Sequence, residues 1–211
     1  MTSVQSSRFR QWLVLCLLVL TSACGSGEPS QQLEVLGQDA IILAFGDSLT
    51  YGTGAKHQTE SYPAVLAQLS GKTVINAGVP GEVSGEGLSR LKSLLNEHQP
   101  ELVLLCHGGN DLLRKLDTGK LKDNLQQMIQ LIRAQGAEVV MLSVPKPGLF
   151  LKPAPLYSEL ADRLQVLLEN EIIADVESET ALKSDAIHPN AAGYRLIAER
   201  LHQLLSQAGA L

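Results

Sequence analysis

Residues 40–50 read Ala-Ile-Ile-Leu-Ala-Phe-Gly-Asp-Ser-Leu-Thr, and this stretch decides the fold class. Ala40–Phe45 is a short apolar run without alternation, which is typical of a strand buried on both faces of a parallel sheet. Ser48 follows closely behind that run. Because functional groups in open α/β sheets collect at the carboxyl ends of the strands, we expect Ser48 to lie at a functional edge.

Apolar runs and amphipathic stretches alternate along the rest of the chain. Four further candidate strands are Thr73–Ala77, Leu102–Cys106, Glu138–Ser143 and Ile172–Val176. Leucine-rich stripes at helical spacing predict helices over Tyr62–Leu69, Glu86–His98, Leu121–Gln135, Leu156–Asn170 and Ala191–Gln207. Alternating βα units predict an α/β fold, a three-layer α/β/α sandwich around a five-stranded parallel sheet in the flavodoxin-like order 2-1-3-4-5.

The beginning of the chain has a different character. Arg8 and Arg10 precede a short apolar run over Trp12–Leu20, which is typical of a secretory signal and short for a permanent membrane span. Small residues 21–23 lead to Cys24, and the segment resembles a bacterial lipoprotein signal in which the cysteine carries the lipid. The resemblance implies a membrane anchor at Cys24. Because the residue directly after Cys24 is glycine and not aspartate, it also implies the periplasmic face of the outer membrane.

Three segments are therefore expected. Residues 1–23 are interpreted as a signal peptide, residues 24–37 as a flexible tether rich in Gly, Ser, Pro and Gln, and residues 38–211 as one folded domain. Ordinary secretion with an unmodified Cys24 and an uncleaved membrane anchor are the alternatives.

The composition excludes several classes of function. The chain has 17 basic and 22 acidic residues, a net charge of −5 and only 4% aromatic residues, so nucleic-acid binding is not expected. Cys106 is the one cysteine of the expected domain and follows an apolar run, which predicts a buried core thiol and no disulfide. No His, Cys or carboxylate cluster has metal-ligand spacing, so we expect no metal or other cofactor, and we expect a monomer.

Ser48, Asp185 and His188 together form a candidate Ser-His-Asp set. A serine hydroxyl is a weak nucleophile unless a base takes its proton. His188 is the natural base, and Asp185, close before it in the chain, would hold the other ring nitrogen. On its own, His188 would be interpreted as a surface or capping residue. Asn190 is a candidate cap for the last helix.

Two glycine-rich loops follow the second and third expected strands, Gly78-Val79-Pro80-Gly81 and Gly108-Gly109-Asn110-Asp111. The N–H groups of Ser48 and Gly81 and the side-chain amide of Asn110 would supply three oxyanion donors from three strand ends. The alternative is that the glycines serve only tight turns.

Three further polar residues lie beside Ser48 and the second glycine-rich loop. Asp47 and Asp111 are expected to accept hydrogen bonds that shape their loops. His107 has two open roles, a contact with substrate or a packing role.

The segment Val144–Tyr157 contains several prolines, which we expect to exclude a regular helix or a central strand. Leu149, Phe150 and Leu151 would then form a hydrophobic wall for an acyl chain at the functional edge. The alternative is a loop packed back onto the domain.

Four ordered blocks resemble the SGNH (GDSL) hydrolase family, and the resemblance covers roughly residues 40–206. They are Gly46-Asp47-Ser48-Leu49, Asn76-Ala77-Gly78-Val79-Pro80-Gly81, Gly108-Gly109-Asn110-Asp111 and Asp185-Ala186-Ile187-His188-Pro189. The serine is not in Gly-x-Ser-x-Gly, so the nucleophile elbow of α/β-hydrolases is excluded. The second block continues with Glu82 where many relatives have aspartate.

The resemblance implies a serine esterase with Ser48 as nucleophile, His188 as base, Asp185 as its partner, and Gly81 and Asn110 as oxyanion donors. The bacterial thioesterase/lysophospholipase/arylesterase subgroup is most similar, which implies lysophospholipids, aryl esters or thioesters as small acyl-ester or lipid substrates. Two alternatives remain: a carbohydrate or cell-envelope O-acetylesterase, and a non-catalytic envelope lipoprotein that retains the fold.

Overall fold

The computed structural model describes residues 31–148 and 150–211. The expected signal peptide, Cys24, the first part of the tether and Leu149 therefore lie outside the described residues. The centre of the fold is a parallel sheet in the order β2-β1-β3-β4-β7. Its strands are β1 (Ile41–Gly46), β2 (Thr73–Gly78), β3 (Leu102–Cys106), β4 (Glu138–Leu142) and β7 (Leu167–Glu169). A small antiparallel ribbon follows β4 and consists of β5 (Pro145–Lys146) and β6 (Lys152–Pro153).

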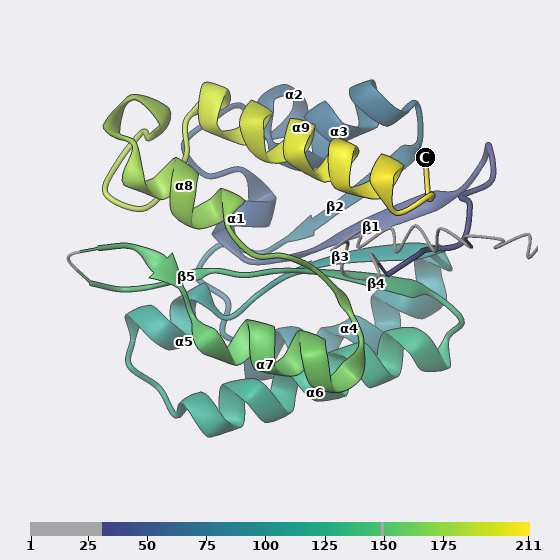
Figure 1. The fold of residues 1–211 in the computed structure, drawn as a ribbon, viewed down its shortest axis with the longest axis horizontal. Helices are drawn as coiled ribbons and strands as arrows, with labels where there is room; N and C mark the ends of the chain where they lie inside the picture. Colours follow the sequence, from purple (N-terminus) through teal and green to yellow (C-terminus); the bar gives the residue numbers. More distant parts are fainter. Residues whose placement is uncertain (1–30, 149) are drawn as a thin grey trace, which may run out of the picture.

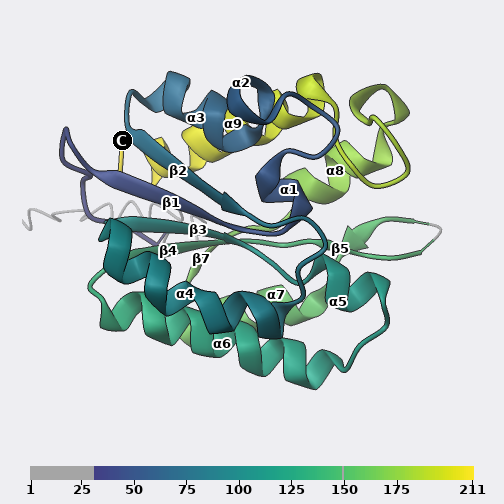
Figure 2. The same cartoon turned by 180° about the vertical axis from the view of Figure 1, so that it is seen from behind.

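Helices cover both faces of this sheet, as Figures 1 and 2 show from opposite sides. One layer contains α1 (Ser48–Tyr51), α2 (His57–Glu60), α3 (Tyr62–Ser70), α8 (Ile172–Ser178) and α9 (Ala191–Gln207), with the short 3-10 turn Thr180–Leu182 between the last two. The other layer contains α4 (Ser84–His98), α5 (Gly109–Leu113), α6 (Thr118–Ala134) and α7 (Pro155–Leu164). The expected three-layer fold and strand order are confirmed.

The core lies between the sheet and the two helical layers. The runs 42–45, 102–106 and 139–142 on the three central strands are all at most 2% exposed. Burial on both faces explains why these strands appear in the sequence as continuous apolar runs. Cys106 is a free thiol inside this core, as expected.

The fifth strand is not the one that the sequence indicated. Ile172–Val176, expected as a strand, forms most of helix α8, and the strand is β7, which falls inside the expected helix Leu156–Asn170. Gln165 adopts a left-handed conformation that ends α7 early. The Glu169 carboxylate then accepts the N–H groups of Glu171, directly before α8, and of Ile172, its first residue, which favours a helix start there.

Two other segments differ from what the sequence suggested. Leu33 and Leu36, in the second half of the expected tether, are buried, and their N–H groups donate at 2.9 Å to the carbonyls of Ala208 and Ala210. After the β5–β6 ribbon, helix α7 begins at Pro155. The prolines therefore do not exclude a helix at the end of that segment, because proline is tolerated in a first helical turn.

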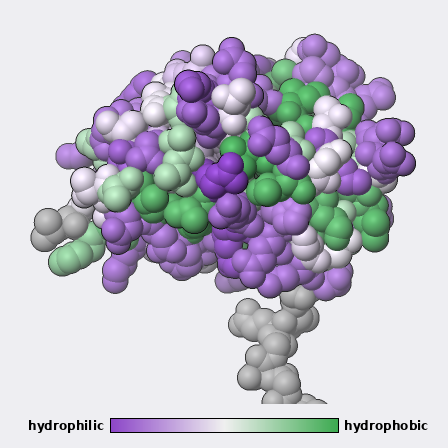
Figure 3. Space-filling view, turned by 90° about the horizontal axis from the view of Figure 1, so that it is seen from above, coloured by the Kyte–Doolittle hydropathy of each residue, from purple (hydrophilic) through white to green (hydrophobic). Residues whose placement is uncertain are grey.

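The face of the molecule seen in Figure 3 is mainly polar. Seen from above, hydrophilic side chains cover most of the molecule and apolar side chains form separate patches between them (Figure 3). Within the described residues, no helix combines the length and the apolar character needed to cross a membrane.

Candidate active site

Ser48 stands where β1 turns into the short helix α1. Asp47 caps this helix, and its Oδ1 accepts the N–H of Leu49 at 3.1 Å. Gly46 is required before the turn, because a Cβ there would lie 2.1 Å from the carbonyl oxygen of Cys106. The chain therefore presents Ser48 at the carboxyl end of a central strand, as the sequence predicted.

Asp185 and His188 lie in the loop that leads into α9. The Oδ1 atom of Asp185 accepts the N–H groups of Ile187 and His188, each at 2.9 Å, and this shapes the loop. Asn190 then caps α9 by accepting two N–H groups of its first turn, which confirms the expected cap.

The two loops bring the Ser-His-Asp set together. His188 Nδ1 lies 2.7 Å from Asp185 Oδ2, and His188 Nε2 lies 3.1 Å from Ser48 Oγ. The backbone N–H of Ile187, together with the hydrogen bonds from His188, lowers the pKa of Asp185 to about 2. An ionised Asp185 accepts a hydrogen bond from the Nδ1–H group of His188, which leaves Nε2 free to accept the hydroxyl proton of Ser48.

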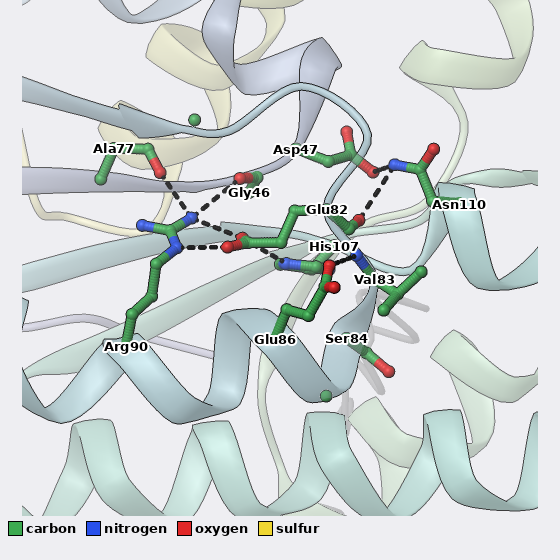
Figure 4. A network of polar contacts seen from close by, with 12 residues as sticks. Gly46, Asp47, Ala77, Glu82, Val83, Ser84, Glu86, Arg90, His107 and Asn110 are labelled. Carbon is green, nitrogen blue, oxygen red and sulfur yellow. Dashed lines mark hydrogen bonds and ion pairs between the residues drawn. The ribbon is translucent and has the colours of Figure 1, made fainter.

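The three expected oxyanion donors come from the ends of three neighbouring strands. Asn110 Nδ2 lies 3.2 Å from Asp47 Oδ2 and 3.0 Å from the carbonyl oxygen of Glu82 (Figure 4). Ser48 and Asn110 line one pocket, whereas Gly81 lies outside that lining on the loop beside Glu82. Within the described residues, neither the Ser48 nor the Gly81 N–H donates a hydrogen bond, so both donors are available.

The neighbouring carboxylates have structural partners. Asp47 is buried, and this burial raises the pKa of its carboxyl. Asp111 accepts the N–H of Ser84 at 2.8 Å and its hydroxyl at 2.6 Å, which ties α5 to the start of α4. His107 is fully buried and does not line the pocket, so a packing role describes it better than a contact with substrate.

A pocket of about 780 Å³ opens beside Ser48 and His188. Phe150 and Leu151 line it, and Phe150 is 78% exposed, so the Phe150 side chain is not packed back onto the domain. The other apolar lining residues are Leu49, Leu113, Val144, Pro145, Pro147 and Ile187. Leu149, the third expected member of this wall, lies outside the described residues.

Glu177 also lines this pocket, and the sequence reasoning did not single it out. Only 6% of the residue is exposed, and this burial raises the pKa of its carboxyl to about 8, against an opposing effect of Lys183. The side chain is therefore a neutral acid near pH 7. The sequence did not indicate that Glu177 faces the pocket, because the segment directly before it was interpreted as a strand and not as part of helix α8.

A family model described as "GDSL-like Lipase/Acylhydrolase family" matches residues 44–196. The arylesterase of Vibrio mimicus is 34% identical over 175 residues, which cover 78% of this chain and 87% of that protein. The protein named thioesterase 1/protease 1/lysophospholipase L1 of Escherichia coli K12 is 31% identical over 166 residues, which cover 75% of this chain and 79% of that protein.

Two solved structures are similar to this chain in both fold and sequence. The crystal structure of TesA has a TM-score of 0.73 and 28% identity over 80% of this chain and 99% of that chain. The psychrotrophic esterase EstA from Pseudoalteromonas sp., in a structure inhibited by monoethylphosphonate, has a TM-score of 0.71 and 27% identity over 80% of this chain and 98% of that chain.

Proposed function

The chain belongs to the GDSL-like lipase/acylhydrolase family and is an ester-hydrolysing enzyme, and we propose that Ser48, His188 and Asp185 form its catalytic triad. The observation that carries this proposal is the continuous line of hydrogen bonds from Asp185 through His188 to Ser48, at 2.7 Å and 3.1 Å. A histidine that only capped a helix would have no need to face a serine hydroxyl at hydrogen-bond distance.

The proposed reaction has two halves. His188 Nε2 takes the proton of the Ser48 hydroxyl while Oγ attacks the carbonyl carbon of the ester, and the imidazolium then protonates the leaving alcohol. Water, activated by the same nitrogen, hydrolyses the acyl-serine, releases the acid and restores Ser48. The ionised Asp185 holds the ring in the required tautomer and stabilises the imidazolium in both halves.

Charge that develops on the ester carbonyl oxygen needs preorganised donors. The Ser48 N–H, the Gly81 N–H and the Asn110 amide are the proposed set. Asn110 Nδ2 carries two hydrogens, and both have acceptors without substrate, Asp47 Oδ2 and the Glu82 carbonyl. The contact with Asp47 is the longer of the two. We therefore infer that the hydrogen of Asn110 Nδ2 that points to Asp47 is the one that also donates to the oxyanion.

The proposed substrates are acyl esters with an apolar acyl group. The apolar wall that includes Phe150 and Leu151 supports this class, because apolar surface buried against it stabilises the bound ester. The names of the relatives, arylesterase and thioesterase/lysophospholipase, support aryl esters, thioesters and lysophospholipids as the classes to test.

The proposed location is the cell envelope, through a lipid on Cys24. The basic residues, apolar run and small residues before Cys24 support this proposal. Replacing Cys24 by serine is expected to move the protein from the membrane fraction to the soluble fraction of the envelope. An unchanged distribution, without incorporation of labelled palmitate in the wild type, would refute the anchor.

The test of the proposed activity is hydrolysis of p-nitrophenyl esters from acetyl to palmitoyl by the full chain, beside Ser48→Ala. We expect the substitution to lower kcat at least about a thousandfold without lowering the melting temperature. Ser89→Ala, at an exposed serine on α4, is the matched control and should keep full activity.

Two results would change the proposal. Activity that persists in Ser48→Ala would exclude this nucleophile. Activity confined to acetyl esters, with acetate released from acetylated glycans, would favour the O-acetylesterase alternative over acyl-lipid substrates.

A further inference from the structure

Glu82 and Arg90 form an ion pair beside the active site that the triad chemistry does not use. Arg90 Nε donates to Glu82 Oε1 and Arg90 Nη2 donates to Glu82 Oε2, both at 2.6 Å. The Glu82 side chain is only 6% exposed. Two parallel N–H···O bonds set the orientation of the partners as well as their distance, so this pair is a rigid connection.

His107 is the third member of this cluster (Figure 4). Its Nε2 lies 3.1 Å from Glu82 Oε2, while its Nδ1 is buried and has no hydrogen-bond partner among the described residues. Burial raises the pKa of Glu82, but the hydrogen bonds from His107 and Arg90 outweigh it and hold the pKa below its ordinary value. The ionised carboxylate only accepts, so His107 donates to it through Nε2.

Arg90 also holds the ends of two strands. Its Nη2 lies 2.9 Å from the carbonyl oxygen of Ala77 on β2 and 3.2 Å from that of Gly46 on β1. The guanidinium lies 4.3 Å from the centre of the Phe45 ring, which supports it from one side. Gly46 is followed by Asp47 and Ser48. Arg90 therefore contacts the end of the strand that presents the proposed nucleophile.

Glu82 connects the other two donor-bearing segments. It directly follows Gly81 in the chain, and its own carbonyl oxygen accepts from Asn110 Nδ2 at 3.0 Å. Through His107 its carboxylate contacts the end of β3, three residues before Asn110. One ion pair therefore contacts the ends of β1, β2 and β3, and each of these ends carries one proposed oxyanion donor.

We propose that the Glu82–Arg90 pair positions the oxyanion hole, by setting the relative places of the Ser48 N–H, the Gly81 N–H and the Asn110 amide. This inference rests on the proposed function of these three donors. Glu82 and Arg90 touch no reacting atom and act as positioning residues. Donors must be held within about 0.5 Å of the productive geometry, which loops without such a connection do not guarantee.

The test uses Arg90→Lys and Glu82→Gln in the full chain. Lysine keeps the positive charge but cannot form the two-pronged contact, and glutamine keeps the shape but loses the charge. We expect kcat for p-nitrophenyl acetate to fall about 10- to 100-fold in each variant with KM within about twofold of wild type. The double variant should be no worse than the worse single variant, because both substitutions remove one interaction.

Binding of butylboronic acid is the readout that a merely structural role would not move. Its tetrahedral adduct with the serine places a negatively charged oxygen in the oxyanion hole. Affinity for this inhibitor should therefore fall in parallel with kcat.

Arg200→Lys is the matched control. Arg200 Nε donates to the buried Glu169 at 2.7 Å, a similar pair that does not line the pocket. This variant should lose some stability and keep its kcat and its boronate affinity. If Arg200→Lys lowers kcat as much as Arg90→Lys, the effect is general loosening and the proposal is overturned.

The outcomes separate this inference from the proposed function. Folded Arg90→Lys and Glu82→Gln variants with wild-type kcat and boronate affinity, beside an inactive Ser48→Ala, would overturn the positioning role alone. Activity retained in Ser48→Ala would overturn both proposals. If either variant does not fold, Glu82→Asp keeps the charge and shortens the arm by one methylene, and a kcat loss of about 3- to 10-fold is expected there; an unchanged kcat would overturn the positioning role.

Discussion

His188 Nε2 lies 3.1 Å from Ser48 Oγ, although 140 positions separate the two residues in the chain. Both stand at the same edge of the sheet, one after β1 and one before α9. Tyr194 on α9 donates to the carbonyl oxygen of Thr53, shortly after α1, at 2.8 Å and holds the two loops in place. The contact between base and nucleophile is thus a product of how the first and last elements of the domain pack.

Asp185→Asn is expected to lower kcat by about 10³- to 10⁴-fold while the loop stays folded. The amide oxygen can still accept the N–H groups of Ile187 and His188, but the amide nitrogen would face His188 Nδ1 and favour the wrong tautomer. Steady-state kinetics with p-nitrophenyl acetate measure this. Asp162→Asn, at an exposed position on α7, is the control; an Asp185→Asn variant as active as this control would contradict the assignment.

Glu177 makes the stability of the fold depend on pH. Its pKa is about 8 in the folded protein, against an ordinary value of 4.5, so the folded state holds this proton more tightly than the unfolded chain. The contribution of Glu177 is therefore most favourable below pH 4.5 and is lost as the pH rises through 8.

Glu177→Gln cannot ionise, so its stability should rise relative to wild type by on the order of 3–5 kcal/mol between about pH 5 and pH 9. Urea unfolding of both proteins across this range measures the difference. A difference in unfolding free energy that does not change with pH would show that Glu177 has the same pKa in the folded and the unfolded protein.

Glu177 should also make the acyl preference depend on pH. Lys183, Asp47 and Asp185 influence the pKa of Glu177 through their charges, and Lys152 lines the same pocket. When Glu177 ionises, apolar chains beside it would desolvate a charge, so KM for decanoyl esters should rise severalfold above about pH 8 while KM for acetyl esters stays constant. Glu177→Gln should remove this rise; the same rise in both proteins would assign it to another group.

Phe150→Ala tests the apolar wall without disturbing the core. The residue is 78% exposed, so the free energy of unfolding should stay within about 0.5 kcal/mol of wild type. The kcat/KM for decanoyl and longer esters should fall severalfold, because each methylene that loses its contact forfeits up to about 0.8 kcal/mol. Val35→Ala, at an equally exposed residue outside the pocket, is the control. An unchanged chain-length profile in Phe150→Ala would remove this residue from the acyl site.

Gly46→Ala is expected to destabilise the fold by about 3 kcal/mol or more. The new Cβ would meet the Cys106 carbonyl oxygen at 2.1 Å and Thr50 Oγ1 at 2.3 Å, and the carbonyl belongs to a buried strand that cannot move aside. Gly37→Ala is the matched control, because a Cβ there meets nothing within 4 Å. Thermal unfolding of both variants compares them, and equal melting temperatures would contradict the steric requirement at Gly46.

The elements that the sequence predicted well are those with strong local signals. Leu102–Cys106 matches β3 at both ends, and the strands on either side of it agree within one residue. Central strands are buried on both faces, so their apolar runs are continuous and their ends are sharp. The helix over Ala191–Gln207 also agrees at both ends, because Asn190 caps it through hydrogen bonds within its own first turn.

The edge strand β7 could not be predicted from a local signal of this kind. β7 has three residues and, among the residues that the structure describes, pairs only with β4, so its leucines fit the stripe of the preceding helix equally well. Ile172 and Ile173 favoured a strand by composition, but a helix begins there, where the Glu169 carboxylate accepts the N–H groups of Glu171 and Ile172. Pairing across the sheet decided this segment, and no local pattern reports that pairing.

The sequence by itself determined the central strands, the helical faces, the Asn190 cap of the last helix, and which serine, histidine and aspartate to examine, because these depend on residue type and spacing over a few positions. Only the tertiary structure decided that β7 is the edge strand, that Arg90 joins Glu82 to two strand ends, and that Glu177 is buried in the pocket. Such relationships depend on which distant elements pack together, and packing alone sets the burial and the electrostatic surroundings that give a side chain its chemistry.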